Sequence, residues 1–267
     1  MRQRVFDSHV HVFPDKIAAS TVNHIAGVGG VEPSFDGTRS GLLGSMDQAG
    51  IDAALNCPIA TRADQVEGIN SWAIANNSWP VLSLGTMHPD FEDPVAECKR
   101  LKDEGIQGIK MHPEYQAFTL EESRTRRIWD AVQRVQMLLL LHTGADIGFP
   151  APHRTSPETV ARFQKAYPGI TLVAAHLGGW HMWDRVEQHL IGSAVNLDLS
   201  FVFPCLSIEK VERLVREHGW ERILFASDAP WASQQEALTR FEKLQLPGEA
   251  KACILWGNAM RLLGFEA

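Results

Sequence analysis

Two histidines separated by one residue lie near the start of the chain, in Val5-Phe6-Asp7-Ser8-His9-Val10-His11. Alternate side chains of a strand leave the same face, about 6 to 7 Å apart along the backbone, so His9 and His11 are expected to point together. Asp7 shares that expected face and would support His9 from behind. Two such imidazoles can bind one metal ion when other parts of the fold supply the remaining ligands. The motif therefore predicts half of a metal site.

Further side chains suited to metal binding or acid–base chemistry end short apolar runs later in the chain. His142, His176 and Asp228 each close such a run, and Lys110 and His112 share one expected face near the end of another. Histidine nitrogens with a carboxylate suit Zn²⁺ and would also hold Mn²⁺, Fe²⁺ or Co²⁺. These residues can complete the site only if the fold brings the ends of their runs together.

Eight short runs rich in Val, Ile and Leu are too brief for helices and continuous enough for strands buried on both faces. The runs are Val5–Val12, Asp52–Pro58, Val81–Met87, Gln107–His112, Met137–His142, Thr171–Leu177, Ala194–Phe201 and Ile223–Asp228. Segments with helical spacing separate them, and Asp93-Pro94 and Ser156-Pro157 are typical of helix starts. Strict alternation of this kind requires parallel strands joined by right-handed crossovers.

Eight such units predict an α/β fold, a closed (β/α)₈ TIM barrel forming a single domain over residues 1–267. An open, doubly wound sheet is the alternative. In a barrel of this type the chemistry lies at the carboxyl ends of the strands, which is where the candidate residues fall. The connection Phe13–Arg39 after the first run is long and glycine-containing, and we expect it to form a loop over the barrel mouth.

The composition of the chain limits the classes of molecule that we expect it to bind. A formal net charge of −7 gives no basic field for nucleic acid or anionic lipid. The four cysteines lack CxxC spacing, which favours reduced thiols, and no leader or membrane-spanning run is evident, so a cytoplasmic location is expected. We expect a small-molecule substrate, and the sequence leaves open both a monomer and a homo-oligomer.

The ordered motifs resemble the strand-end motifs of the amidohydrolase superfamily. They are Phe6–His11, Gly108–Pro113, Leu141–Gly144, Ala175–Gly179 and Ser227–Trp231. More narrowly, the chain is similar to the branch that contains aminocarboxymuconate semialdehyde decarboxylase and small metal-dependent hydrolases, and Ile254–Gly264 is similar to the closing helix of that branch. The resemblance extends from the first strand to the last helix.

The resemblance implies that one divalent metal, zinc first among the candidates, is bound by four residues: His9, His11, His142 and Asp228. Asp228 and His176 would be the catalytic residues, moving protons or stabilising developing negative charge. In binuclear relatives a carboxylated lysine after strand four bridges two metals, and Lys110 stands at that place. The alternative for Lys110 is an unmodified ammonium that orients a substrate carboxylate or pairs with Asp228.

Three functions are compatible with these residues. The first is a metal-dependent hydrolase that uses a metal-activated water to cleave a small amide, lactone or ester. It is favoured because the decarboxylase branch does not require the Lys110-x-His112 pair. The alternative is a metal-dependent decarboxylase of an aromatic or unsaturated carboxylic acid, and the third is a barrel that binds a ligand without turnover. Lys110, His112 and Arg154 are expected to contact the substrate. Lys110 and His112 lie near the end of the fourth run. Arg154 follows the fifth run, and arginine can bind a carboxylate through two hydrogen bonds.

Overall fold

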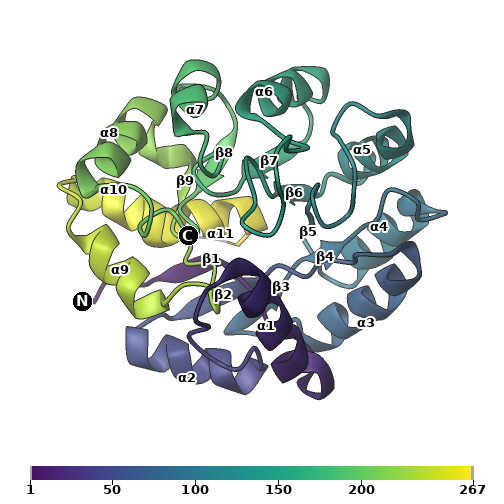
Figure 1. Ribbon diagram of the computed structural model, residues 1–267, viewed down its shortest axis with the longest axis horizontal. Coiled ribbons are helices and arrows are strands. Elements are labelled where there is room, and N and C mark those ends of the chain that lie inside the picture. Colours follow the sequence, from purple (N-terminus) through teal and green to yellow (C-terminus); the bar gives the residue numbers. More distant parts are fainter. Residues whose placement is uncertain (1, 266–267) are drawn as a thin grey trace.

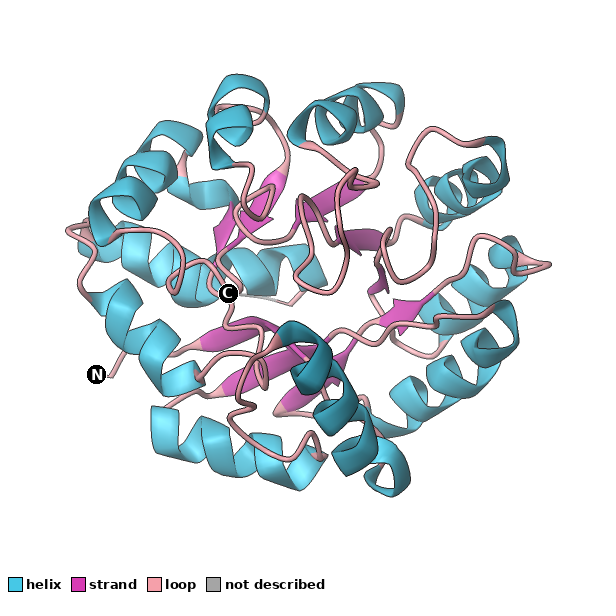
Figure 2. Ribbon diagram, viewed as in Figure 1, coloured by secondary structure: helices cyan, strands magenta, loops and turns pink. Residues whose placement is uncertain are grey.

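The computed structural model describes residues 2–265 as a ring of short parallel strands enclosed by helices (Figures 1 and 2). The strands are β1 Phe6–Val10, β2 Ala53–Asn56, β3 Val81–Ser83, β4 Gly85–Thr86, β5 Gly108–Met111, β6 Leu138–Leu141, β7 Thr171–Ala174, β8 Asn196–Asp198 and β9 Ile223–Leu224. Each of the eight apolar runs in the sequence contains at least one of these strands.

The strands close into a barrel. They pair in the orders β1-β2-β3 and β4-β5-β6-β7-β8-β9, and only Leu84 separates β3 from β4, so these two occupy one position in the ring. The first and last strands meet through the backbone: the N–H of Ser8 donates to the carbonyl of Phe225 and the N–H of Asp228 to the carbonyl of His9, both at 2.9 Å. The (β/α)₈ TIM barrel expected from the sequence is confirmed.

Helices follow the strands, and most of them form the outer layer. They are α1 Asp15–Gly29, α2 Arg39–Ala49, α3 Val66–Asn76, α4 Pro94–Asp103, α5 Ser123–Val135, α6 Pro157–Ala166, α7 Trp183–His189, α8 Ile208–His218, α9 Gln234–Glu242, α10 Gly248–Ala252 and α11 Asn258–Leu263. Helix starts follow the sequence signals: the Asp93 side chain accepts from the N–H of Ala96 at 3.0 Å before α4, and Ser156 caps α6. None of the helices within residues 2–265 has the length and apolar character needed to cross a membrane.

Alternation along the strands sorts side chains between two cores. In β6, Leu139 and Leu141 pack outward in the large core under the helices, whereas Leu138 and Leu140 belong to the core inside the barrel. His142 lies two residues beyond Leu140, so its side chain also points into the barrel. The carboxyl ends of the strands thus turn polar side chains into the barrel mouth, where water or a ligand can reach them.

A register shift in β1 changes this alternation. Phe6 packs inside the barrel, while Val10 and Val12 pack outside, and the pairing of β1 with β2 is irregular between Asp7 and Val10. The extra residue lets His9 and His11 face inward although Asp7 faces outward. Asp7 therefore does not share the face of His9, contrary to the sequence expectation.

The two ends of the barrel are covered differently. At the amino end, Trp256, Met260 and Leu263 from the C-terminal helical segment pack into the inner core. At the carboxyl end, the connection expected to be a loop over residues 13–39 contains the helix α1, with Ile17 and Ile25 facing the cavity described below. The helix forms because Ala18, Val22 and Ala26, spaced by four, are buried on one face.

Candidate metal centre

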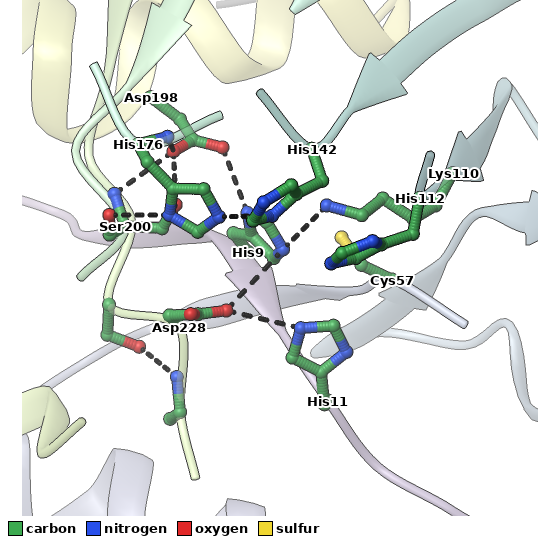
Figure 3. Close-up of polar contacts among 12 residues, drawn as sticks. His9, His11, Cys57, Lys110, His112, His142, His176, Asp198, Ser200 and Asp228 are labelled. Atoms are coloured by element: carbon green, nitrogen blue, oxygen red, sulfur yellow. Dashed lines mark hydrogen bonds and ion pairs between the residues drawn. The ribbon is translucent and has the colours of Figure 1, made fainter. Parts of the chain in front are cut away.

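The first group of candidate ligands lies where the barrel closes. His9 and His11 come from β1 and the residue just beyond it, and Asp228 from the turn after β9. Oδ1 of Asp228 lies 3.2 Å from Nε2 of His11 and 3.5 Å from Nε2 of His9. One ligand atom from each residue falls within 4.8 Å of the others, and Figure 3 shows the side chains converging. Three of the four ligands expected from the sequence are thus together.

The backbone at two candidate catalytic residues is strained. Asp228 has a φ of 72° and His176 a φ of 59°, in the left-handed region that costs a residue other than glycine about 1 to 2 kcal/mol. Such conformations persist where surrounding contacts compensate, and they concentrate at functional sites. At Asp228 the turn directs the carboxylate toward His11 while the N–H remains bonded to His9.

Asp198, at the end of β8, fixes the orientation of His9. Its Oδ2 accepts a hydrogen bond from Nδ1 of His9 at 2.9 Å, and its Oδ1 accepts from the backbone N–H groups of His176 and Ser200 at 3.0 Å each. Because the ring proton of His9 is thereby held on Nδ1, the lone pair of Nε2 faces the site. Asp198 was not among the residues expected from the sequence, although its alternation with Asn196 and Ser200 in an apolar run is a signal that could have identified it.

Lys110 lies inside the barrel with 1% of its surface exposed. Its Nζ donates to Nε2 of His9 at 3.0 Å. Burial lowers the pKa of this ammonium, and the nearby negative charges of Asp198, Asp228 and Asp146 oppose that change. A positive charge is thus already accommodated beside the nitrogen that would bind a metal.

His142 and His112 form a second group with Asp146, from the loop after β6. Oδ2 of Asp146 lies 3.3 Å from Nε2 of His112 and 3.8 Å from Nε2 of His142, and the two rings stack with centroids 3.9 Å apart. In this arrangement His142 is grouped with His112 and Asp146, and the first group comprises His9, His11 and Asp228 alone. His176 lies next to the second group, with Nε2 2.9 Å from Nδ1 of His142.

Burial controls the charge of the histidines. It lowers the pKa of His9 to about 4, with the positive charge of Lys110 as the next cause. Burial also holds the pKa values of His112 and His142 well below their usual range, again assisted by neighbouring positive charge. All three imidazoles are therefore uncharged at neutral pH, which is the form that binds metals.

The carboxylates are ionised. Burial raises the pKa of Asp228, but the hydrogen bond with His11 and the electrostatic attraction to the ring of His9 outweigh it and hold the pKa well below its usual range. The same balance, with His9 as the main partner, lowers the pKa of Asp198. Uncharged imidazole nitrogens beside an ionised carboxylate fit a divalent metal ion.

Of the three residues predicted to contact the substrate, two line the cavity and one does not. Lys110 and His112 line the cavity above the metal centre. Arg154 is not among the lining residues: its backbone N–H donates to Glu114 at 2.6 Å, its guanidinium lies 3.7 Å from the same carboxylate, and its side chain is 41% exposed. The neighbouring acid thus holds Arg154 at the rim.

A cavity of about 890 Å³ opens at the barrel mouth, over both groups, within the usual range for small-molecule sites. Its wall includes six aromatic residues, Phe13, Trp72, Tyr115, Trp180, Phe201 and Trp231. Among the lining residues of the described chain, Lys110 is the sole lysine or arginine. The cavity is therefore apolar at its wall and polar at its floor.

The chain belongs to the amidohydrolase family, because residues 6–265 match the family described as Amidohydrolase. This confirms the resemblance inferred from the strand-end motifs. A comparison with curated proteins finds no match.

Solved structures share the fold across the whole chain. An uncharacterised TIM-barrel protein from Bordetella bronchiseptica is 18% identical with a TM-score of 0.76, and the match covers 98% of each chain. A 2,6-dihydroxybenzoate decarboxylase from Rhizobium is 17% identical with a TM-score of 0.71, covering 98% of this chain and 99% of the other. A 5-carboxyvanillate decarboxylase from Novosphingobium aromaticivorans, complexed with manganese and 4-hydroxy-3-methoxy-5-nitrobenzoic acid, is 15% identical with a TM-score of 0.73, covering 98% and 96%.

Proposed function

We propose that this protein is a metal-dependent decarboxylase that releases CO₂ from a small aromatic or unsaturated carboxylic acid. The observation that carries the proposal is the cavity, in which one buried ammonium and a metal-ligand group lie beneath an aromatic wall. Such a cavity suits a flat, apolar molecule with its anionic end toward the floor. The decarboxylases with the same fold act on hydroxylated aromatic acids. This similarity supports decarboxylation over the hydrolysis that the sequence favoured.

Each polar group then has a role. His9, His11 and Asp228 would hold a divalent metal, which would supply a Lewis acid to stabilise negative charge on the substrate. Lys110 binds the substrate carboxylate as its ion-pair partner. We propose Mn²⁺ beside Zn²⁺, because manganese is bound in the Novosphingobium enzyme.

The reaction exchanges CO₂ for a proton. The bond between the carboxyl carbon and its neighbour breaks, the electron pair stays on the neighbouring carbon, and a proton is added there. Asp228 lines the cavity beside His11, and we assign it to carry that proton, taken from solvent, to the carbon. His176 also lines the cavity and is the second group proposed for proton transfer.

The experiment uses protein reconstituted with Mn²⁺ or Zn²⁺ and a panel of hydroxybenzoic and unsaturated acids in D₂O. We expect CO₂ release and deuterium at the carbon that carried the carboxyl group. Lys110→Met should raise KM for the acid by about 10- to 100-fold, because a charge-assisted contact is lost. The control Lys165→Met, on the outer helix α6, should leave KM unchanged.

Hydrolysis is the second candidate, favoured by an ionised carboxylate, Asp228, that can accept a proton from water beside two histidines. Amides, lactones and esters incubated with the same protein in H₂¹⁸O would then yield ¹⁸O-labelled product. Labelled product without CO₂ release from any acid would replace the decarboxylase proposal with this one. Protein that binds metal and a member of either panel but turns over neither panel would favour the ligand-binding barrel.

A further inference from the structure

We propose that the outer part of the cavity binds a second, uncharged and mainly apolar unit of the substrate, such as a second ring. The outer part of the cavity is the space that α1 and residues 65–72 line, beyond the polar floor. The favoured acid is then longer than one with a single ring. The inference rests on the proposed function only in placing the carboxylate at the floor, beside Lys110.

The cavity is larger than an acid with one ring requires. A cavity of about 150 Å³ is enough to hold benzene, so a ring with its carboxylate and hydroxyl groups needs roughly twice that volume. The cavity at the barrel mouth has about 890 Å³. A single-ring acid would therefore leave more than half of the space to water. Because ligand sites usually enclose most of the surface of the ligand, this volume indicates a longer molecule.

Two helices, α1 and α3, lie beside each other (Figure 1), and each turns one face toward the outer part of the cavity. Helix α1 contributes Ile17, Ser20, Thr21, His24 and Ile25. The residue before α3 and the helix itself contribute Gln65, Gly68, Ile69 and Trp72. Steps of three and four residues place each set on one side of its helix. These sides differ from the buried ones, which contain Ala18, Val22 and Ala26 in α1 and Val66, Asn70 and Ala73 in α3.

Contacts with two loops hold α1 in place at the barrel mouth. A Cβ added to Gly29 would lie only 3.2 Å from Ile147, so the C-terminal end of α1 packs closely on the loop after β6. Beyond the helix, the N–H of Ser34 donates to the carbonyl of Pro230 at 2.8 Å, in the loop after β9. These contacts oppose an inward movement of α1 that would close the space between α1 and α3.

Gly68 keeps the wall opposite α1 free of a side chain. It lies within α3, where glycine destabilises a helix relative to alanine. The backbone does not require glycine here, because the φ of Gly68 is not positive. Packing does not require it either, because an added Cβ would meet no atom within 4 Å. The space that a side chain would fill belongs to the cavity, so Gly68 leaves room for a ligand at the expense of helix stability.

The side chains of the outer part suit an uncharged, apolar unit. Ile17 is 48% exposed and Ile147 is 53% exposed, and both line the cavity. A ligand that extends outward from the floor would remove this apolar surface from water, which is favourable. Among the described residues, those that α1 and residues 65–72 contribute to the lining include no Asp, Glu, Lys or Arg. A charged unit would find no ion-pair partner there and would lose hydration without compensation.

The experiment compares 2,6-dihydroxybenzoate with 2,6-dihydroxy-4-phenylbenzoate, which carries a second ring opposite the carboxylate. Kd is measured by isothermal titration calorimetry on the full-length chain dialysed against Mn²⁺, CO₂ release is recorded in parallel, and KM replaces Kd for an acid that is turned over. We expect the two-ring acid to bind about 10- to 100-fold more tightly, because a phenyl group leaves water.

Gly68→Leu places a side chain where the second ring would lie. It should weaken binding of the two-ring acid about tenfold or more and that of the single-ring acid by less than about threefold. Gly44→Leu is the matched control, because Gly44 lies within α2, outside the cavity lining, and an added Cβ there also meets no atom within 4 Å. It should leave both affinities unchanged.

The outcomes separate this inference from the proposed function. Equal affinity for the two acids would overturn the inference, and so would a preference that Gly68→Leu leaves intact or a two-ring acid that does not bind. A preference that is lost in Gly68→Leu, without CO₂ release from either acid, would support the outer part as a binding region and contradict decarboxylation. CO₂ release from both acids with equal KM would do the reverse.

A variant on the opposite wall keeps the inference testable if Gly68→Leu fails to fold. Ile17→Ser changes an exposed side chain of α1 and should weaken binding of the two-ring acid about 3- to 10-fold. Val95→Ser, which changes an exposed apolar residue of α4 outside the cavity lining, should leave it unchanged. Equal effects of the two serine variants would contradict a ring bound against α1.

Discussion

Replacing Asp198 with Asn tests how the second layer of the site controls metal binding. The change keeps the shape of the side chain, and its oxygen can still accept from the N–H groups of His176 and Ser200. The amide nitrogen, however, comes to lie 2.9 Å from Nδ1 of His9, in place of an accepting oxygen. Two donors then face each other, unless the proton of His9 moves to Nε2, the nitrogen that a metal at the first group needs.

The magnitude follows from the contact that is lost. A hydrogen bond to a charged group contributes about 1.5 to 3 kcal/mol, and residues that orient metal-binding histidines typically affect metal affinity by about 10- to 100-fold. We therefore expect the Kd for Mn²⁺ or Zn²⁺ to rise about 10- to 100-fold in Asp198→Asn. Ser200→Ala is the matched control: it removes a neighbouring hydrogen bond to Asp198 but leaves the contact with His9.

Competition with a coloured chelator measures the affinity at neutral pH. Ser200→Ala should change Kd by about threefold or less. The hydrogen bond that it removes joins Ser200 to Asp198, and neither residue is a proposed metal ligand. An unchanged Kd in Asp198→Asn, with folding intact by circular dichroism, would refute the view that Asp198 sets the tautomer of His9.

Two further predictions concern stability. Burial raises the pKa of Asp7 from 3.8 to about 6 despite hydrogen bonds from Ser227 and Gln234, so the native chain binds this proton more tightly than the unfolded chain and loses stability as pH rises through that interval. Denaturant titrations of metal-free protein should give the difference in the free energy of unfolding between wild type and Asp7→Asn. We expect this difference to fall by about 3 kcal/mol as the pH rises from 3.8 to about 6. A difference that stays constant with pH would contradict this. Gly144→Ala should lower the free energy of unfolding by about 2 to 4 kcal/mol, because φ is +91° and the new Cβ would lie 2.3 Å from the backbone nitrogen of Trp180. Gly192→Ala, with φ +76° and no atom within 4 Å, should cost about 1 to 2 kcal/mol, and equal losses would show that crowding at Gly144 is unimportant.

The barrel and most of its site positions could be predicted because they depend on local patterns. Strands buried on both faces require continuous apolar runs, and a side chain that ends such a run lies at the barrel mouth. His9, His11 and Asp228 could therefore be expected to converge. Asp198 follows the same rule but was overlooked within its apolar run.

The features that escaped prediction depend on contacts between distant segments. The shift in β1 that turns Asp7 outward is set by pairing with β2 and β9, and no residue type near Asp7 marks it. Helix α1 contains Gly27 and Gly29, which suggested a loop, yet it is stabilised by burying one face against the barrel. The grouping of His142 with Asp146 depends on the path of a loop, which spacing in the sequence does not specify.

The closure of the ring between its first and last strands bears on when the chain could bind the proposed metal during biosynthesis. The ribosome releases His9 and His11 first, and their partner Asp228 emerges 217 residues after His11. The three donors can meet only when the last strand has joined the first, so metal uptake at the first group would follow closure of the ring. An ion bound there fastens the two edges of the ring, and by favouring the closed form it opposes opening at the seam.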